Sequence, residues 1–279
     1  MPHDVQMEAK VRAEWLDDAT CAAWRRWHDK SVHFWRELNA ALFAHAMLAP
    51  GQRVLDLAGG TGDPGLEIAR RVAPGEVVIT DFAPPMVEIA RDFAARDGVA
   101  NVTCTAADAH ALPFPDASFD RVTCRLGIMF FWDSQRALAE VRRVLRPGGR
   151  AVFLVWGPPE QNEFIRLLTG PFKKRRPPPG VSQQFRYAPA GMLGGEMRAA
   201  GFRNVLEEPL TVRIAWPGPP EELWQRQYEV SAPMRPYFNS FSEAERAECI
   251  AEVVAGLRSR YDGREIPTNA PIIVGTGEK

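Results

Sequence analysis

The fold of this chain is decided by one stretch, Val54-Leu55-Asp56-Leu57-Ala58-Gly59-Gly60-Thr61-Gly62-Asp63-Pro64-Gly65. An apolar, strand-like run ends in a glycine-rich turn, and Pro64 suits the first turn of a helix. Glycines let the backbone approach a ligand closely, and a helix N-terminus offers unpaired N–H groups and a positive dipole. The spacing Gly60-x-Gly62-x-x-Gly65 also matches the dinucleotide-binding fingerprint, so the loop alone leaves its ligand open.

Around this loop, short β-branched runs alternate with helical stretches over residues 52–156. Such alternation predicts right-handed βαβ units and a parallel sheet covered on both faces. The expected strands are Arg53–Leu57, Val77–Thr80, Asn101–Thr105, Phe119–Cys124 and Arg150–Trp156. The expected helices are Pro64–Val72, Pro85–Arg96 and Ser134–Leu145.

The segments that flank this core differ from it in pattern. Aromatic residues at roughly helical spacing predict a helical cap over residues 1–48. Two late strands, Val205–Trp216 and Ile272–Gly275, are expected to pair antiparallel on one edge of the sheet, with residues 217–266 as a helical insertion between them. We therefore expect a single domain over residues 1–279, made of the cap 1–48, a cofactor-binding core over 50–156 and a C-terminal half over 157–279.

The C-terminal half carries a basic run, Lys173-Lys174-Arg175-Arg176, followed by three prolines. We expect it to lie in a loop from Gly170 to Gly180. Such a run either steers an anionic acceptor or is simply solvated, and both readings stay open. Further helices are expected at Ala190–Ala200, Glu221–Val230 and Ser242–Arg260.

Composition excludes several classes of protein. Of 279 residues, 46% are hydrophobic and 25% are charged, and the formal net charge is −1, which argues against binding nucleic acid or an anionic membrane by bulk electrostatics. The four cysteines form no CxxC pair, so neither a zinc site nor a disulfide framework is expected. The first residues lack a secretory signal, and no apolar run is long enough to span a bilayer. We expect a cytoplasmic protein whose partner is a small molecule.

Three acidic residues lie at or just after the carboxyl ends of the first three strands, and they narrow the choice of ligand. Asp56 ends the first strand, where a carboxylate either orders the loop or holds an ammonium group. Asp81 ends the second strand, where an acidic group accepts hydrogen bonds from ribose hydroxyls, which NAD and S-adenosylmethionine (SAM) both possess. Asp108-Ala109 follows the third strand, where an adenine amino group could be bound.

Taken together, these motifs make the chain resemble class I SAM-dependent methyltransferases. Residues 56–63, Thr80-Asp81-Phe82 and Ala107-Asp108-Ala109 match the first three motifs of that family, and residues 112–120 and 143–150 look like its UbiE-type (ubiquinone/menaquinone C-methyltransferase) branch. The resemblance implies a Rossmann-like fold with a mostly parallel seven-stranded sheet, helices on both faces and an antiparallel edge pair. It implies SAM as cofactor, bound by Asp56, Ala58, Gly59, Gly60, Thr61, Gly62, Asp81, Phe82, Met86, Asp108, Ala109 and Arg125.

After the fourth strand the chain departs from this branch. Quinone methyltransferases typically carry an Arg-Asn pair where this chain has Met129-Phe130, so the resemblance does not assign a quinone acceptor. The Asn/Asp-Pro-Pro-aromatic signature of amino-methyltransferases is absent as well. The flexible, apolar side chains at these positions either bind a hydrophobic or aromatic molecule or belong to the core. We expect the substrate pocket to include Trp24, Met129, Phe130 and Tyr187.

Methyl transfer from a sulfonium needs mainly alignment, which contributes about 7–11 kcal/mol. A base is required only if the acceptor loses a proton during attack. No metal and no nucleophilic residue is expected. His28 is the candidate base, because it lies among tryptophans in a segment able to cover the cofactor; the alternative is a structural histidine. We expect His110 to lie near the turn that follows Asp108-Ala109, away from the acceptor.

The sequence thus predicts an enzyme that transfers a methyl group from SAM to a small hydrophobic or aromatic molecule, with C- or O-methylation favoured. The alternatives are a SAM-binding module without catalysis and an NAD(P)-dependent oxidoreductase. The acceptor atom is not decided, because specificity in this fold lies in the divergent flanks. The oligomeric state also stays open, with a homodimer as one option.

Overall fold

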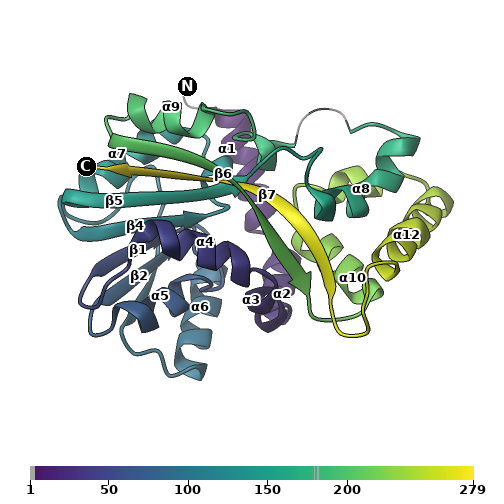
Figure 1. The fold of residues 1–279 in the computed structure, drawn as a ribbon, viewed down its shortest axis with the longest axis horizontal. Helices are drawn as coiled ribbons and strands as arrows, with labels where there is room; N and C mark the ends of the chain where they lie inside the picture. Colours follow the sequence, from purple (N-terminus) through teal and green to yellow (C-terminus); the bar gives the residue numbers. More distant parts are fainter. Residues whose placement is uncertain (1–3, 179, 181) are drawn as a thin grey trace.

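Seven strands form one mixed sheet in the order β3-β2-β1-β4-β5-β7-β6 (Figure 1). The computed structural model describes residues 4–178, 180 and 182–279. Strands β1 to β5 pair in parallel, whereas β7 runs antiparallel to both β5 and β6. The predicted Rossmann-like architecture with an antiparallel edge pair is thereby confirmed. The strands span Arg53–Leu57 (β1), Glu76–Asp81 (β2), Val102–Ala106 (β3), Phe119–Arg125 (β4), Leu145–Trp156 (β5), Arg203–Trp216 (β6) and Ile266–Glu278 (β7).

Helices cover both faces of this sheet because each buries an apolar stripe against it. Helix α5 packs against β2, α6 against β3, α7 against β5, and α9 against β6 and β7. The strand order reverses between β1 and β4, and ligands of open α/β sheets bind beside such a switch point, beyond the carboxyl ends of the strands. The helices span Gly65–Val72 (α5), Pro84–Arg96 (α6), Ser134–Val144 (α7) and Met192–Ala199 (α9).

The N-terminal cap, for which the aromatic spacing predicts a helical structure, forms four helices. They span Val5–Trp15 (α1), Asp18–Arg26 (α2), His28–Phe34 (α3) and Arg36–Ala46 (α4). Asp4 and Asp17 start the first two, since each carboxylate accepts a hydrogen bond from a backbone N–H three residues later. Helix α4 packs on β5, β6 and β7, which fixes the cap to the sheet.

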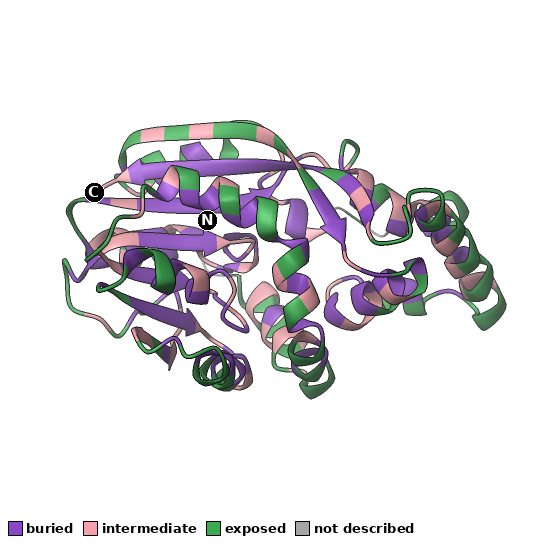
Figure 2. Ribbon diagram, turned by 60° about the horizontal axis from the view of Figure 1, so that its bottom comes forward, coloured by how far each residue is buried: buried purple, intermediate pink, exposed green. Residues whose placement is uncertain are grey.

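The insertion between β6 and β7 is helical, as predicted, and packs against the cap. It contains Pro220–Val230 (α10), Arg235–Asn239 (α11) and Glu243–Arg258 (α12). Helix α10 contacts α2 of the cap and also α12, which in turn packs on Glu163–Arg175 (α8). Figure 1 shows this group at the end of the molecule away from β1–β3. Strand β6 is largely exposed until Ile214, where it becomes buried between cap and insertion (Figure 2).

Three sequence expectations are wrong in detail. Strand β5 begins at Leu145 instead of Arg150, because Leu145 already pairs with Phe119 of β4. The expected loop from Gly170 to Gly180 is helical up to Arg175, because α8 buries Phe172 against rings of the insertion. The basic run therefore occupies the last helical turn and the residue after it, where Arg175 forms ion pairs with α12. Strand β7 begins at Ile266 instead of Ile272, since its early residues pair with β6 despite their polar, proline-containing sequence. In the part of the chain that the structure describes, no helix is long and apolar enough to cross a membrane.

Candidate active site

A cavity lies beyond the carboxyl ends of β1 to β5, enclosed by α1 to α3 of the cap and by α10 of the insertion. This is the place that the reversal of strand order predicts for a ligand. Its lining includes fourteen of the seventeen residues that the sequence predicts for the site: Trp24, His28, Ala58, Gly59, Gly60, Thr61, Asp81, Phe82, Met86, Asp108, Ala109, Arg125, Met129 and Phe130. Asp56, Gly62 and Tyr187 do not line it.

The glycine loop passes close to buried side chains beneath it. A Cβ atom added to Gly59 would lie 2.6 Å from Cγ2 of Ile79, and its N–H donates to the carbonyl of Thr80 at 2.9 Å. Gly60 has a φ of 53°, a left-handed conformation that glycine adopts without strain. Only a glycine at position 59 therefore lets the loop sit this low over β2 and leave its upper surface to the cavity.

Asp56 lies under this loop instead of in the cavity. It is fully buried, and its Oδ1 accepts a hydrogen bond from the Thr123 hydroxyl at 2.7 Å. A Cβ atom at Gly59 or Gly65 would approach its Oδ2 to 3.0 or 2.9 Å. Burial raises the pKa of Asp56 to about 7. Of the two roles considered for this carboxylate, ordering the loop fits the structure, and contact with a ligand does not.

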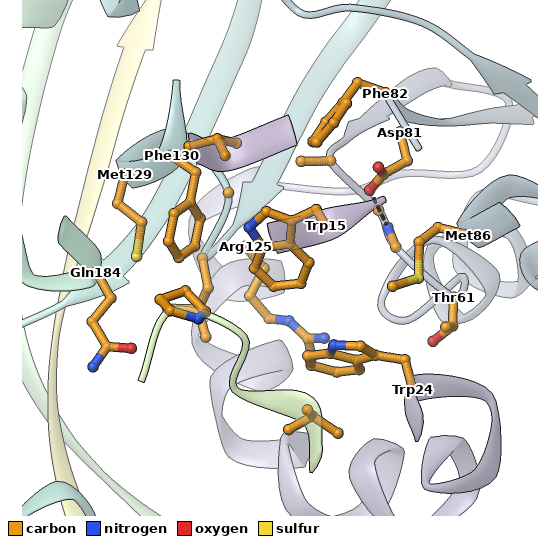
Figure 3. Close-up of a pocket in the computed structure, with 18 of the residues that line it drawn as sticks. Trp15, Trp24, Thr61, Asp81, Phe82, Met86, Arg125, Met129, Phe130 and Gln184 are labelled. Carbon is orange, nitrogen blue, oxygen red and sulfur yellow. Dashed lines mark hydrogen bonds between the residues drawn. The ribbon is translucent and has the colours of Figure 1, made fainter. Parts of the chain in front are cut away.

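Asp81 faces the cavity from the end of β2. Its Oδ2 accepts a hydrogen bond from the N–H of Gly60 at 3.0 Å (Figure 3). Its Oδ1 accepts a hydrogen bond from the N–H of Ala83, also at 3.0 Å. These bonds fix the carboxylate, which retains free lone pairs for ligand hydroxyls. Burial raises the pKa of Asp81 to about 6. In Figure 3, Met86 and Thr61 lie on the same side of the cavity as Asp81.

Asp108 is held by its close neighbour His110 and by Arg12 of the distant cap. Its Oδ1 accepts hydrogen bonds from the N–H and Nδ1 of His110 at 2.9 and 2.6 Å, and Arg12 of the cap donates to its Oδ2 at 3.3 Å. Burial raises its pKa, but the interactions with His110 and the charge of Arg12 together outweigh burial, and the pKa lies below its ordinary value. His110 stacks on Trp132 at 4.2 Å and lines the cavity beside Asp108. The sequence does not indicate Arg12, because its contact spans 96 residues.

Arg125, at the end of β4, joins the glycine loop to the cap. Its Nη1 donates to Oδ2 of Asp63 and to Oδ1 of Asn39, both at 2.6 Å, and its Nη2 donates to the Asp63 carbonyl at 2.9 Å. The side chains of Arg125 and Asp63 are each only 9% exposed, so this pair is shielded from solvent. The charge of Arg125 is thus matched within the protein. Asn39 and Asp63 were not identified from the sequence.

His28 contacts Thr61, in the middle of the same loop. Its Nδ1 lies 2.9 Å from the hydroxyl of Thr61, and its ring stacks on Phe93 with centroids 3.7 Å apart. Burial lowers the pKa of His28, so the imidazole is neutral at pH 7 and able to accept a proton. These contacts account for a structural histidine, while its place in the cavity wall keeps it within reach of a ligand.

The rest of the cavity lining is rich in aromatic side chains, which form an aromatic wall. Met129 and Phe130 belong to a short 3₁₀ turn after β4, Ile128–Phe130, and line the cavity together with Trp24. Trp15 of the cap packs edge-on against Phe130, with ring centroids 5.4 Å apart, and lies 6.3 Å from Trp24. Figure 3 shows Met129, Phe130 and Gln184 across the cavity from Asp81.

Tyr187 lies outside this wall, and its expected place in the pocket is not what the structure shows. Its side chain is fully buried, and its hydroxyl donates to Glu196 of α9 at 2.6 Å. The neighbouring Arg186 points back to the carbonyl of Phe131 at 3.0 Å and to Ser134. This turn therefore supports the aromatic wall from behind.

Comparisons with known proteins agree with this geometry. Residues 54–149 match the family model described as a methyltransferase domain. The chain is 43% identical over 177 residues to a demethylmenaquinone methyltransferase of Thermus thermophilus, covering 59% of this chain and 80% of the relative. It is 38% identical over 179 residues to the ubiquinone/menaquinone biosynthesis C-methyltransferase UbiE of Geobacter sulfurreducens, covering 59% and 70% of the two chains.

Solved structures support the fold. A putative methyltransferase of Bacillus halodurans superimposes with a TM-score of 0.56 at 22% identity, covering 86% of this chain and 98% of the other. The YcgJ protein of Bacillus subtilis gives a TM-score of 0.54 at 24% identity, covering 86% and 97%. With the relatives above, these findings show that this chain belongs to the UbiE-like class I SAM-dependent methyltransferases, enzymes that methylate a small hydrophobic acceptor.

Proposed function

We propose that the acceptor is a flat aromatic ring of the quinol type, methylated on a ring carbon. The observation that carries this proposal is the cluster of Trp15, Trp24 and Phe130, whose rings pack together in the cavity lining. Ring faces and edges offer a flat molecule a large contact area at little entropic cost. The names of the relatives from Thermus thermophilus and Geobacter sulfurreducens support the same class of acceptor.

The cofactor, in this proposal, occupies the side of the cavity formed by the strand ends. Asp81 accepts hydrogen bonds from the ribose hydroxyls, Asp108-Ala109 contacts the adenine, and the backbone of residues 58–61 contacts the methionine part. The free lone pairs of Asp81 and the low path of the glycine loop fit such a ligand. Bound SAM supplies an electrophilic methyl group. Asp56 and Gly62 act indirectly by setting the shape of the loop.

His28 is proposed as the group that removes the proton released when a ring carbon is methylated. Its depressed pKa keeps it in the basic form at neutral pH. The hydroxyl of Thr61 orients the ring through Nδ1. His28→Gln keeps a hydrogen-bonding side chain of similar size, so a fall in turnover without a change in affinity for S-adenosylhomocysteine (SAH) is the result that supports a base. Unchanged turnover assigns the residue to structure alone.

The proposed acceptor is tested with methyl-deuterated SAM and 1,4-dihydroxynaphthalene under reducing conditions. We expect mass spectrometry to find one labelled methyl group on the product, and NMR to place it on a ring carbon. Labelled methyl on oxygen, or transfer only to amines or thiols in parallel reactions, would contradict the quinol assignment. Asp81→Ala serves as the control that abolishes transfer from SAM.

A further inference from the structure

Arg226 is a buried cation without a carboxylate partner. It lies in the middle of α10, is 1% exposed and lines the cavity. Its Nη1 donates to Gln227 at 3.1 Å and its Nη2 to the hydroxyl of Ser31 at 3.3 Å, while its Nε has no partner. Among residues 4–178, 180 and 182–279, no acidic side chain forms an ion pair with it. Arg125, by contrast, is paired with Asp63.

Aromatic rings surround this guanidinium and stabilise it only in part. Its Cζ lies 5.3 Å from the ring centre of Trp24, 5.2 Å from that of Trp35 and 5.5 Å from that of Phe34. Cation–π contacts of this kind offset some of the cost of burial. Burial and the charge of Arg125 lower the pKa of Arg226 to about 9, so the side chain still carries its charge at pH 7. A buried cation normally has an anion beside it.

Neighbouring side chains on the same wall also lack acceptors. The indole nitrogens of Trp15 and Trp24 are buried donors without partners, and both residues line the cavity. Among the cavity-lining side chains that the structure describes, every buried polar atom without a partner is therefore an N–H donor. A wall with one unmatched positive charge and spare donors selects a ligand that brings oxygen atoms and negative charge.

We propose that Arg226 binds an ionised oxygen of the methyl acceptor, so that the enzyme prefers an anionic ring, a phenolate or ring carboxylate, over a neutral one. The inference rests on the proposed function, because it places the acceptor on the aromatic wall. Arg226 belongs to that wall through Trp24, and it comes from the insertion instead of from the strand ends. An anion here also balances the sulfonium charge that SAM brings. The other source of a matching group is the carboxylate of SAM itself.

The test is calorimetric titration of the SAH-loaded protein with 2-naphthoate and with 2-naphthamide, two probes of similar shape that differ in charge. We expect the wild type to bind naphthoate at least about tenfold more tightly, as befits a buried charge-assisted hydrogen bond. Arg226→Gln is expected to abolish this preference and to leave naphthamide binding within about threefold. Arg226→Lys keeps the charge but loses the fork of donors, and an intermediate preference is expected.

Arg235→Gln is the matched control. Arg235 lies in the same insertion and is held by Asp17, the N-cap of α2, and by Thr20 of α2, but it does not line the cavity. We expect this variant to lower the melting temperature and to leave the naphthoate preference intact. If Arg226→Gln does not fold, the ratio of naphthoate to naphthamide affinity in the wild type and in Arg226→Lys still tests the proposal. A wild type that binds the two probes equally well overturns it.

Two further results separate the sources of the anion and the two proposals. Weakened SAH binding by Arg226→Gln, with the naphthoate preference unchanged, would assign Arg226 to the carboxylate of the cofactor and overturn the inference. Naphthoate binding that depends on Arg226, in an enzyme that leaves 1,4-dihydroxynaphthalene unmethylated, supports the anion site and contradicts only the quinol acceptor.

Discussion

The two sides of the cavity are built in different ways. The side assigned to the cofactor consists of backbone and carboxylates at the ends of consecutive parallel strands, within residues 57–110. The side assigned to the acceptor consists of large side chains from α1, α2, the 3₁₀ turn after β4, and α10, so that Trp15 and Arg226 line one cavity although more than two-thirds of the chain separates them. Topology fixes the first side, whereas packing of the cap on the insertion fixes the second. Mutations on one side should therefore impair binding of the cofactor, and mutations on the other side binding of the acceptor, without affecting both.

The largest effect is expected on the cofactor side. Asp81→Ala removes the carboxylate assigned to the ribose, and two hydrogen bonds to a charged group contribute about 1.5–3 kcal/mol each. We expect calorimetry to show an SAH affinity lower by at least about a hundredfold. Asp92→Ala, on the exposed side of α6, removes only a surface ion pair with Arg25 and serves as the control. An SAH affinity within about threefold of wild type in Asp81→Ala would contradict the assignment.

A mutation on the acceptor side should weaken binding of the acceptor and leave binding of SAH unchanged. Phe130→Ala removes a ring from the aromatic wall, where Trp15 packs edge-on against it. Loss of apolar contact and of the ring pair predicts a KM for 1,4-dihydroxynaphthalene about tenfold higher, with SAH affinity unchanged. Phe130→Leu keeps apolar volume, so its KM should lie between those of the wild type and Phe130→Ala. Equal losses of SAH and acceptor binding would show that the two sides do not act separately.

The pH dependence of cofactor binding sharpens the same comparison. Burial raises the pKa of Asp81 to about 6, and only its ionised form accepts hydrogen bonds through both oxygens. Between pH 7 and pH 5 we expect SAH affinity to fall by about tenfold, because protonation removes an acceptor. Asp81→Asn should bind weakly at both pH values. An affinity in the wild type that is constant over this range would place the cofactor away from Asp81.

The smallest effect concerns the carboxylate beneath the loop. The pKa of Asp56 is about 7 in the folded protein, against an ordinary value of 3.8. The native state therefore binds more protons than the unfolded state between these values, and the free energy of unfolding decreases as pH rises from about 4 to 7. Asp56→Asn removes this contribution. Urea unfolding at pH 6.0 and at pH 7.5 should show that the variant loses less unfolding free energy over this interval than the wild type, by roughly 1 kcal/mol. Equal losses in both proteins would contradict the raised pKa.

Much of the cofactor side could be predicted from the sequence, because parallel strands place their carboxyl ends at one edge. Asp81, Asp108 and the glycine loop follow strands directly, and all reach the cavity. Asp56 shows the limit of that argument. Being at a strand end does not say whether a side chain points up to the ligand or, as here, down beneath the loop.

The acceptor side was less predictable because it depends on contacts between distant segments. The place of Met129 and Phe130 after the fourth strand predicts them as pocket residues, but it does not predict the 3₁₀ turn that presents them. Arg226 could not be found this way, since its helical spacing resembles that of any amphipathic insertion and its lack of a partner is visible only in three dimensions. Tyr187 was misplaced for the same reason, because Glu196 of α9 holds its hydroxyl.

The most direct test of the two-sided cavity is a crystal structure of the protein with SAH. We expect the ribose hydroxyls within about 3.2 Å of the Asp81 carboxylate. The sulfur should face the space bounded by Trp24, Met129 and Phe130. A ribose out of hydrogen-bonding reach of Asp81, or a sulfur that faces away from this aromatic wall, would contradict the account.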